Sequence, residues 1–225
     1  MSNTSSLLEK SRFNMIEQQI RPAGILDEKV LGALLSLSRD AFVSDNYKNI
    51  AYTDTEIPIE VDGIATYETM LVPRLEARFA EALQLKPTDT VLEIGTGSGF
   101  QAALLSQLCA NVISVEIDPK IAAFAKANLE KNHINNVKVE IGDGQNGWGS
   151  VEYPAILVTG SIPALTDALK YKLTVGGRLV VVVGTGRTMQ LLRITRDSAS
   201  QFTEEVLQET YIKPLRGPAV SRFKF

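Results

Sequence analysis

The sequence predicts an α/β protein with a doubly wound, mostly parallel, Rossmann-like sheet. After Pro87, short apolar or β-branched segments alternate with helical or long turn segments; they span residues 91–94, 112–116, 137–141, 155–159 and 178–183. Continuous apolar runs of this kind indicate strands that are buried on both faces. Past Gly184, "MQLLRITR" and "EEVLQETYIK" follow each other without a helix between them. They predict an antiparallel pair of strands at one edge of the sheet.

The part of the chain before this alternation has a helical pattern. Apolar side chains recur at helical spacing up to Ile20, and Asp27 is a suitable N-cap for a second helix. A third helix is expected from about residue 70 to 83, with Pro73 tolerated in its first turn. Residues 41–66 have a mixed pattern that indicates loops and short extended pieces.

Composition excludes several classes of partner. The net charge is −3, from 23 basic and 26 acidic side chains, and no run of Lys and Arg forms a basic stripe, so nucleic acid is not an expected partner. The single cysteine, Cys109, excludes an intramolecular disulfide and a multi-cysteine metal site, and no metal is expected. The start of the chain lacks the apolar region of a secretion signal, and no segment approaches the ~18 apolar residues of a membrane span. We therefore expect a cytoplasmic protein without a membrane partner.

The first strand of the alternating region runs into a glycine-rich turn, "VLEIGTGSGF". Gly95, Gly97 and Gly99 would bring backbone N–H groups and a helix N-terminus close to a ligand at the carboxyl end of the strand. Dinucleotide sites use G-x-G-x-x-G, whereas this turn has G-x-G-x-G preceded by Glu93. That form is typical of sites for S-adenosylmethionine, which has no pyrophosphate.

Two further elements follow the next two strands. Glu116 closes the second strand, 21 residues after Gly95, where a carboxylate accepts hydrogen bonds from the hydroxyls of a ribose. Asp143 and Gly144 follow the third strand in "IGDGQNGW". The aspartate suits an exocyclic adenine amine, and the glycine allows the ring to approach the backbone. Alternatively, Asp143 and Gly144 form an ordinary turn, since Asp-Gly is a common turn pair.

In this order, the motifs resemble those of the protein-L-isoaspartate O-methyltransferases. The likeness covers nearly all of residues 13–217 and includes "EQQIRPAGILDEKVLGALLSLSRDAFV", "AYTDTEIPI", "VLEIGTGSGFQAALLS", "GDGQNGW", "VTGSIPAL", "GGRLVVVVG" and "YIKPL". It implies a class I methyltransferase fold, S-adenosyl-L-methionine as cofactor and S-adenosyl-L-homocysteine as product. It also implies a set of cofactor-binding residues, which are Glu93, Gly95, Thr96, Gly97, Ser98, Gly99, Glu116, Ile117, Asp143, Gly144, Thr185 and Gln190.

The resemblance breaks at the loop with which the family receives its substrate. The family pattern is close to G-x-T-I-S-x-P, and an ungapped alignment from Pro58 places "DGIATYETM", residues 62–70, on it. Thr66 falls on the serine and is the candidate catalytic residue, acting as a hydrogen-bond donor to the acceptor and not as a nucleophile. The other motif positions are changed, with Asp62, Ile64, Ala65 and Glu68 in place of Gly, Thr, Ile and Pro. Glu68 either repels an anionic acceptor or points to solvent at a helix N-terminus.

Three functions remain open at this stage. The leading one is S-adenosylmethionine-dependent methylation of a carboxylate, that of L-isoaspartyl residues in damaged proteins or peptides, as a repair step. A carboxylate is ionised at pH 7 and needs no general base, which agrees with a single histidine, His133, in a polar loop. The alternatives are a methyltransferase for a small-molecule acceptor and a non-catalytic module that binds the cofactor. A nicotinamide oxidoreductase is disfavoured by the glycine spacing.

We expect a single domain of 225 residues with two parts. Residues 1–86 would supply the N-terminal helices and the substrate loop. Residues 87–225 would form the S-adenosylmethionine-binding core together with the C-terminal antiparallel strands.

Overall fold

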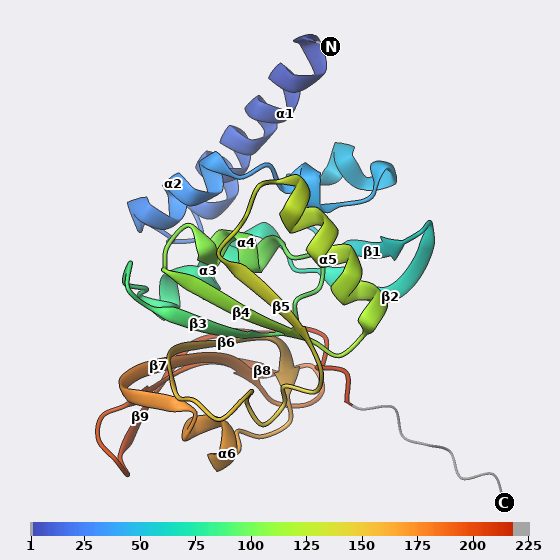
Figure 1. Cartoon of the computed structure of the whole chain (residues 1–225). Coiled ribbons are helices and arrows are strands. Elements are labelled where there is room, and N and C mark those ends of the chain that lie inside the picture. The colour runs from blue at the N-terminus through green and yellow to red at the C-terminus, as the bar shows by residue number, and fades with distance from the viewer. Residues whose placement is uncertain (1, 218–225) are drawn as a thin grey trace, which may run out of the picture.

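A seven-stranded sheet forms the centre of the computed structural model, which describes residues 2–217, with side chains from Leu7 onward (Figure 1). Its strand order is β5-β4-β3-β6-β7-β8-β9. The strands are β3 (Thr90–Ile94), β4 (Asn111–Glu116), β5 (Val137–Ile141), β6 (Tyr153–Ile162), β7 (Leu173–Val183), β8 (Met189–Arg196) and β9 (Phe202–Thr210). Strands β3 to β7 pair in parallel, while β8 is antiparallel to both of its neighbours. The predicted fold class and the antiparallel edge are confirmed.

Helices cover the two faces of the sheet unequally. The α-helices are α1 (Ser2–Met15), α2 (Glu28–Ser36), α3 (Pro73–Leu83), α4 (Phe100–Ser106), α5 (Pro119–Lys131) and α6 (Asp167–Lys170). Helix α1 continues into a π-helical turn, η1 (Ile16–Ile20). Two 3-10 helices follow α2, namely η2 (Arg39–Phe42) and η3 (Asp45–Ile50). Figure 1 shows α3, α4 and α5 on one face, with α1 and α2 beyond them, and α6 on the other. On the second face, loop residues after β5 and the one-turn α6 cover the sheet in place of long helices.

Alternate residues of the central strands pack into two separate cores. Val91 of β3 and Leu157 of β6 point to the helical face, while Leu92 and Val158 point to the opposite face. All four side chains are fully buried. The apolar runs of the sequence therefore do correspond to strands that are covered on both sides.

The segment before α3 differs from the prediction. The short extended pieces expected in residues 41–66 are present as β1 (Ile57–Val61) and the start of β2 (Ile64–Met70), but the two strands pair as an antiparallel hairpin, which the sequence did not predict. Asp62 and Gly63 connect its strands with φ values of 53° and 74°, the backbone that an Asp-Gly type I′ turn adopts. The third helix was predicted from about residue 70 and begins instead at Pro73, because Pro fits the first helical position.

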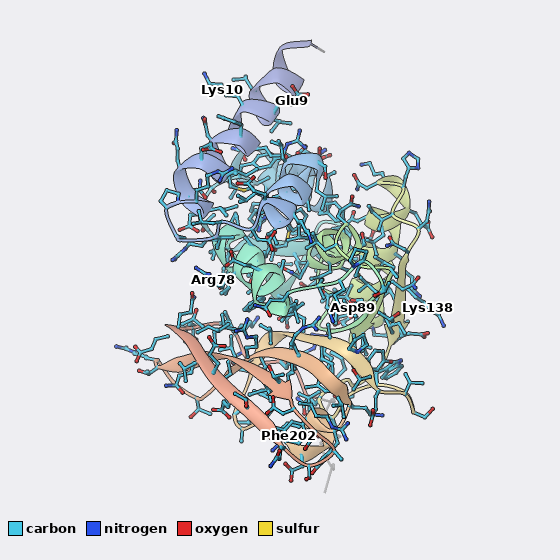
Figure 2. The ribbon with its side chains drawn as sticks, turned by 90° about the vertical axis from the view of Figure 1, so that its left-hand side faces the viewer. Glu9, Lys10, Arg78, Asp89, Lys138 and Phe202 are labelled. Carbon is cyan, nitrogen blue, oxygen red and sulfur yellow. The ribbon has the colours of Figure 1, made fainter. Side chains whose placement is uncertain are left out.

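A buried ion pair ties the helical layer to the sheet. Arg178 of β7 binds Asp89 at 2.7 Å, and its Nε donates to the Leu83 carbonyl at the end of α3. Figure 2 shows Asp89 at the boundary between the helices and the sheet, with Glu9 and Lys10 on α1 at one end of the molecule and Phe202 at the other. In residues 2–217, no helix combines the length and the apolar character that crossing a membrane requires.

Candidate active site

A cavity opens at the carboxyl ends of the central strands. It is lined by residues at or after the carboxyl ends of β3, β4 and β5, by Thr159 and Gly160 within β6, by the end of β2, and by residues 213–216 after β9. The connections from β3 to β4 and from β6 to β7 run in opposite directions across the sheet, so β3 and β6 enclose a topological switch point. Ligands of open α/β sheets bind at such a point.

The glycine turn after β3 has a shape that other residues cannot adopt. Gly95 has a φ of +98°, and a Cβ there would lie 2.3 Å from Thr159 Oγ1. Thr159 donates a hydrogen bond of 2.6 Å to the Gly95 carbonyl and so fixes the turn against β6. Gly97 lines the cavity, with a φ of +55°. Gly99 is the N-cap of α4 and packs on the Ala125 carbonyl, so its role is helix packing.

Glu93 lies underneath this turn and does not line the cavity. Its Oε2 accepts a hydrogen bond from Ser114 Oγ, which lies 2.6 Å from Thr96 Oγ1. Complete burial raises the pKa of Glu93 to about 8 despite the hydrogen bond from Ser114. The carboxyl group is therefore largely protonated at neutral pH, and it supports the turn from below.

Glu116 stands at the end of β4 with its carboxylate toward the cavity. It accepts hydrogen bonds of 3.0 Å from the backbone N–H groups of Gly97 and Asp118. Burial raises the pKa of Glu116, and these backbone hydrogen bonds oppose the rise. Each carboxylate oxygen has lone pairs left over. This is the geometry in which a carboxylate can receive two neighbouring hydroxyl groups.

Asp143 and Gly144 line the cavity beside Ile117. Asp143 Oδ1 accepts a hydrogen bond of 3.0 Å from the Gln145 backbone, so the pair does form a turn. A Cβ at Gly144 would lie 2.9 Å from Ile94 Cγ2. The segment is therefore a turn, as one of the two alternatives predicted, and this turn lines the cavity. Thr96 and Ser98 also line the cavity.

Besides Glu93 and Gly99, three more predicted site residues do not line the cavity. Thr185 and Gln190 are exposed at the β7–β8 connection, and neither lines the cavity. They are separated from it because β6 lies between β7 and the glycine-bearing β3. Thr66 is also absent from the lining. Its hydroxyl donates to the Ile59 carbonyl at 2.8 Å and accepts from the Glu68 N–H at 3.2 Å, so it joins the two strands of the hairpin.

Gln101 is a cavity residue that the sequence prediction missed. Its side chain is only 6% exposed, and neither polar atom of its amide has a hydrogen-bond partner among the described residues. A buried amide without partners is costly, so such a group indicates a ligand that satisfies it. The sequence does hold a sign of this role: Gln101 is the one polar residue in the first turn of the helix "FQAALLS", where its neighbours are apolar.

The chain returns to the cavity after β9, which the prediction also missed. The backbone N–H of Ser161 in β6 donates to the Lys213 carbonyl, and the Ser161 carbonyl accepts from the Leu215 N–H, both at 2.9 Å. A Cβ at Gly160 would lie 2.9 Å from the Leu215 nitrogen, so this close approach requires glycine. The motif "YIKPL" was identified in the sequence as similar to the family, but nothing in the sequence indicated that this segment lies beside β6.

Glu68 does not stand at a helix N-terminus, which was one of the two alternatives raised from the sequence. It lies on β2, outside any helix, and it lines the cavity with a side chain that is 27% exposed. Its carboxylate lies 3.3 Å from Lys213 Nζ and 3.9 Å from Arg216 Nη1. The negative charge is therefore balanced by two cations and does not face the cavity alone.

A mostly parallel sheet whose glycine turn, second-strand glutamate and third-strand Asp-Gly meet in one cavity defines a class I methyltransferase. The family model described as protein-L-isoaspartate(D-aspartate) O-methyltransferase matches residues 10–218. This chain belongs to that family, and the predicted enzyme class, a methyltransferase that uses S-adenosylmethionine, is confirmed.

Relatives and solved structures agree with this assignment. A protein-L-isoaspartate O-methyltransferase from Protochlamydia amoebophila is 40% identical over 205 residues, which is 90% of this chain and 95% of that protein. One from Pelobacter propionicus is 41% identical over 93% of this chain and 92% of its own length. A solved protein-L-isoaspartate O-methyltransferase shares 28% identity with a TM-score of 0.79, over 93% of this chain and 66% of that one.

A Plasmodium falciparum structure in complex with S-adenosyl-L-homocysteine shares the fold. It has a TM-score of 0.75 at 20% identity and covers 93% of this chain and 98% of its own.

Proposed function

We propose that this protein methylates the α-carboxylate of L-isoaspartyl residues in damaged proteins or peptides. The observation that carries the proposal is that two parts of the structure line the same cavity. The glycine turn with Glu116 lies on one side, and the end of the β1–β2 hairpin, with Glu68, lies on the other. A cavity of this kind can hold a methyl donor and an acceptor at the same time.

The residues of the cavity fit S-adenosylmethionine. Glu116 would hold the ribose hydroxyls, and Asp143 with Gly144 would face the adenine. The unpaired amide of Gln101 would bind the polar amino-acid end of the cofactor, which has both donors and acceptors. Gly95 and Gly97 would allow the ligand to approach the backbone without meeting a Cβ.

The bound cofactor supplies an electrophilic methyl group on a positively charged sulfur. A carboxylate acceptor is already ionised at neutral pH, so the protein has no proton to remove from it. Catalysis then rests on holding the acceptor oxygen in line with the methyl group and the sulfur. Thr66 would contribute as a positioning residue, since its hydroxyl holds the hairpin that carries Glu68.

Methylation prepares the repair. The ester carbonyl can lose methoxide, whereas a carboxylate has no comparable leaving group. The next backbone nitrogen therefore attacks the ester carbonyl, the bond to the methoxy oxygen breaks, and the amide proton leaves with it as methanol. The resulting succinimide opens in water, and a fraction of the product is the normal aspartyl bond.

The test is methyl transfer from labelled S-adenosylmethionine to an isoaspartyl peptide and to its normal aspartyl twin. Base-labile label on the isoaspartyl peptide alone is the expected result. Label on small carboxylic acids or phenols but on neither peptide would instead favour the small-molecule acceptor. Binding of S-adenosylhomocysteine without transfer to any acceptor would favour a non-catalytic module.

A further inference from the structure

Two fixed cations and one loosely held anion meet at the mouth of the cavity. Lys213 and Arg216 both contact Glu68, and Arg216 also binds Asp118, the N-cap of α5. Lys213 Nζ further contacts the Tyr67 carbonyl. The side chains of the two cations are 46% and 44% exposed, so a ligand that enters the cavity can reach them.

The backbone that carries the two cations is held in place. Residues 213 and 215 are hydrogen-bonded to Ser161 on both sides of a parallel bridge between Ser161 and Pro214. Strand β6 is one of the central strands of the sheet. The positions of Lys213 and Arg216 are therefore set by the core of the molecule.

Glu68 has a less constrained backbone. In the β1–β2 ladder, Pro58 pairs with Thr69 and Glu60 pairs with Ala65, so residues 66–68 stand opposite Ile59 alone. This is a bulge, and Tyr67 within it has a φ of 65° and a side chain that is 86% exposed. Bulged residues do not pair in the ladder. Glu68 therefore stands outside the regular pairing of the ladder. Its N–H is held by the Thr66 hydroxyl, but its side chain lines the cavity and is 27% exposed, so the carboxylate can turn away from the cations without a change in the core.

The charges at the mouth balance only while Glu68 is in place. Lys213, Arg216, Glu68 and Asp118 together carry no net charge, and the departure of Glu68 leaves one positive charge without a partner. A single carboxylate from outside restores the balance. The acceptor of the proposed reaction carries one such carboxylate, whereas its methylated product carries none.

We propose that Lys213 and Arg216 bind the carboxylate of the acceptor, and that Glu68 occupies this position until the acceptor displaces it. This proposal rests on the proposed function for the identity of the acceptor. Because the ester is neutral, the cations hold it less well than the acid, and Glu68 returns to them when the product forms. The two cations thus determine specificity for an acid over its ester, and Glu68 is a built-in competitor.

The experiment measures binding to the complex of the protein with S-adenosylhomocysteine, by calorimetry, of an isoaspartyl peptide and of its α-methyl ester. Glu68→Gln should tighten binding of the acid roughly threefold to tenfold and leave the ester unchanged, since it removes the competing charge. Lys213→Met combined with Arg216→Met should weaken binding of the acid by about tenfold and make acid and ester equal. Lys138→Met and Glu205→Gln remove exposed charges outside the cavity and serve as matched controls that should change neither affinity.

Kinetics supply a second readout. The cation substitutions should raise KM for the acid with little change in kcat, because the pairing is present in the ground state.

Equal affinity of Glu68→Gln and the unchanged protein for the acid, or full affinity in the double variant, would overturn the inference, as would failure of all forms to bind the acid. If binding responds as expected but no methyl is transferred, the proposed function fails and the anion site stands. If transfer occurs and none of these substitutions affects it or binding, the inference alone fails.

Discussion

The two sides of the cavity are built in different ways. The cofactor side consists of turns that follow adjacent parallel strands, and its groups are held by short-range contacts such as that between Glu116 and the Gly97 N–H. The acceptor side brings together a hairpin near residue 68 and a segment near residue 213, which are joined mainly through charged side chains. In Figure 1 both acceptor elements lie at the same side of the molecule, beyond the ends of the sheet strands.

This difference separates what the fold fixes from what the individual chain can alter. The cofactor side depends on backbone geometry at the ends of buried strands, where a side chain added to a glycine collides with the core. The acceptor side depends on exposed charges and on a bulged hairpin, where substitutions change the free energy of unfolding little. A family can therefore keep its methyl donor while individual members, such as this one with Tyr67 and Glu68, change the surroundings of the acceptor.

Gly95→Ala should have the largest effect. The new Cβ would lie 2.3 Å from Thr159 Oγ1 at a φ of +98°, so strain and collision combine. We expect a loss of about 2–4 kcal/mol in the free energy of unfolding and at least about a 100-fold loss of S-adenosylhomocysteine affinity. Denaturant unfolding and calorimetry measure the two effects.

Gly63→Ala is the matched control on the acceptor side. Gly63 has a similarly positive φ of +74°, but a Cβ there would meet no atom within 4 Å. Only the backbone cost of about 1 kcal/mol should remain, and cofactor affinity should be unchanged. Equal effects of the two substitutions on cofactor affinity would contradict the distinction between the two sides.

The difference between the two sides of the cavity also determines how much of the site can be predicted from the sequence. Gly95, Glu116 and Asp143 could be placed together because parallel strands bring their carboxyl ends to one edge. The pairing of Glu68 with Lys213 spans 145 residues and depends on a segment that leaves the sheet after β9, and no local pattern encodes that return. The sequence indicates short extended pieces here and Asp62-Gly63 is a strong turn signal, but the pairing of the two strands around that turn is not predicted.

Thr185 and Gln190 illustrate a related limit. They were carried over by position from the family, but the register of β7 and β8 places them in and after an exposed turn. A polar residue near a strand end is a candidate only if its strand adjoins the switch point, and sequence position does not reveal that adjacency.

The buried carboxyl of Glu93 should make stability depend on pH. Burial raises its pKa to about 8 in the folded protein, against 4.5 for a glutamate in water. Between these values the folded state holds a proton that the unfolded state releases, so stability falls as the pH rises. We expect the unfolding free energy of the unchanged protein to fall relative to that of Glu93→Gln by at most about 1.4 kcal/mol per pH unit.

Chemical unfolding of both proteins between pH 5 and pH 8.5 measures this difference, which should level off above the pKa of about 8. Glu93→Gln retains the shape of the side chain and a hydrogen-bond acceptor for Ser114, so it is a conservative probe. Parallel pH curves for the two proteins would show that Glu93 is ionised when folded.

Glu116→Ala tests the cofactor side through its carboxylate, which also accepts a hydrogen bond from the Gly97 N–H of the turn. The substitution removes the group that would hold the ribose, and we expect S-adenosylhomocysteine affinity to fall by about 1–3 kcal/mol, or roughly fivefold to 150-fold. Glu68→Gln, a carboxylate change on the acceptor side of the same cavity, should leave that affinity within about twofold. Calorimetry of both variants decides the matter, and an unchanged affinity in Glu116→Ala would remove this residue from the cofactor site.

Thr66→Ala should have the smallest effect, and it separates a positioning role from a chemical one. The lost hydrogen bond to the Ile59 carbonyl should cost about 0.5–1.5 kcal/mol, and cofactor affinity should be unchanged. Turnover on an isoaspartyl peptide should fall by less than about tenfold, because the hairpin that carries Glu68 loosens, and Thr66→Ser should restore it. A loss of about 100-fold or more with stability intact would instead show that the hydroxyl contacts the reacting carboxylate and positions it for attack on the methyl group. The cavity lining favours the smaller effect, since Glu68 contributes to it and Thr66 does not.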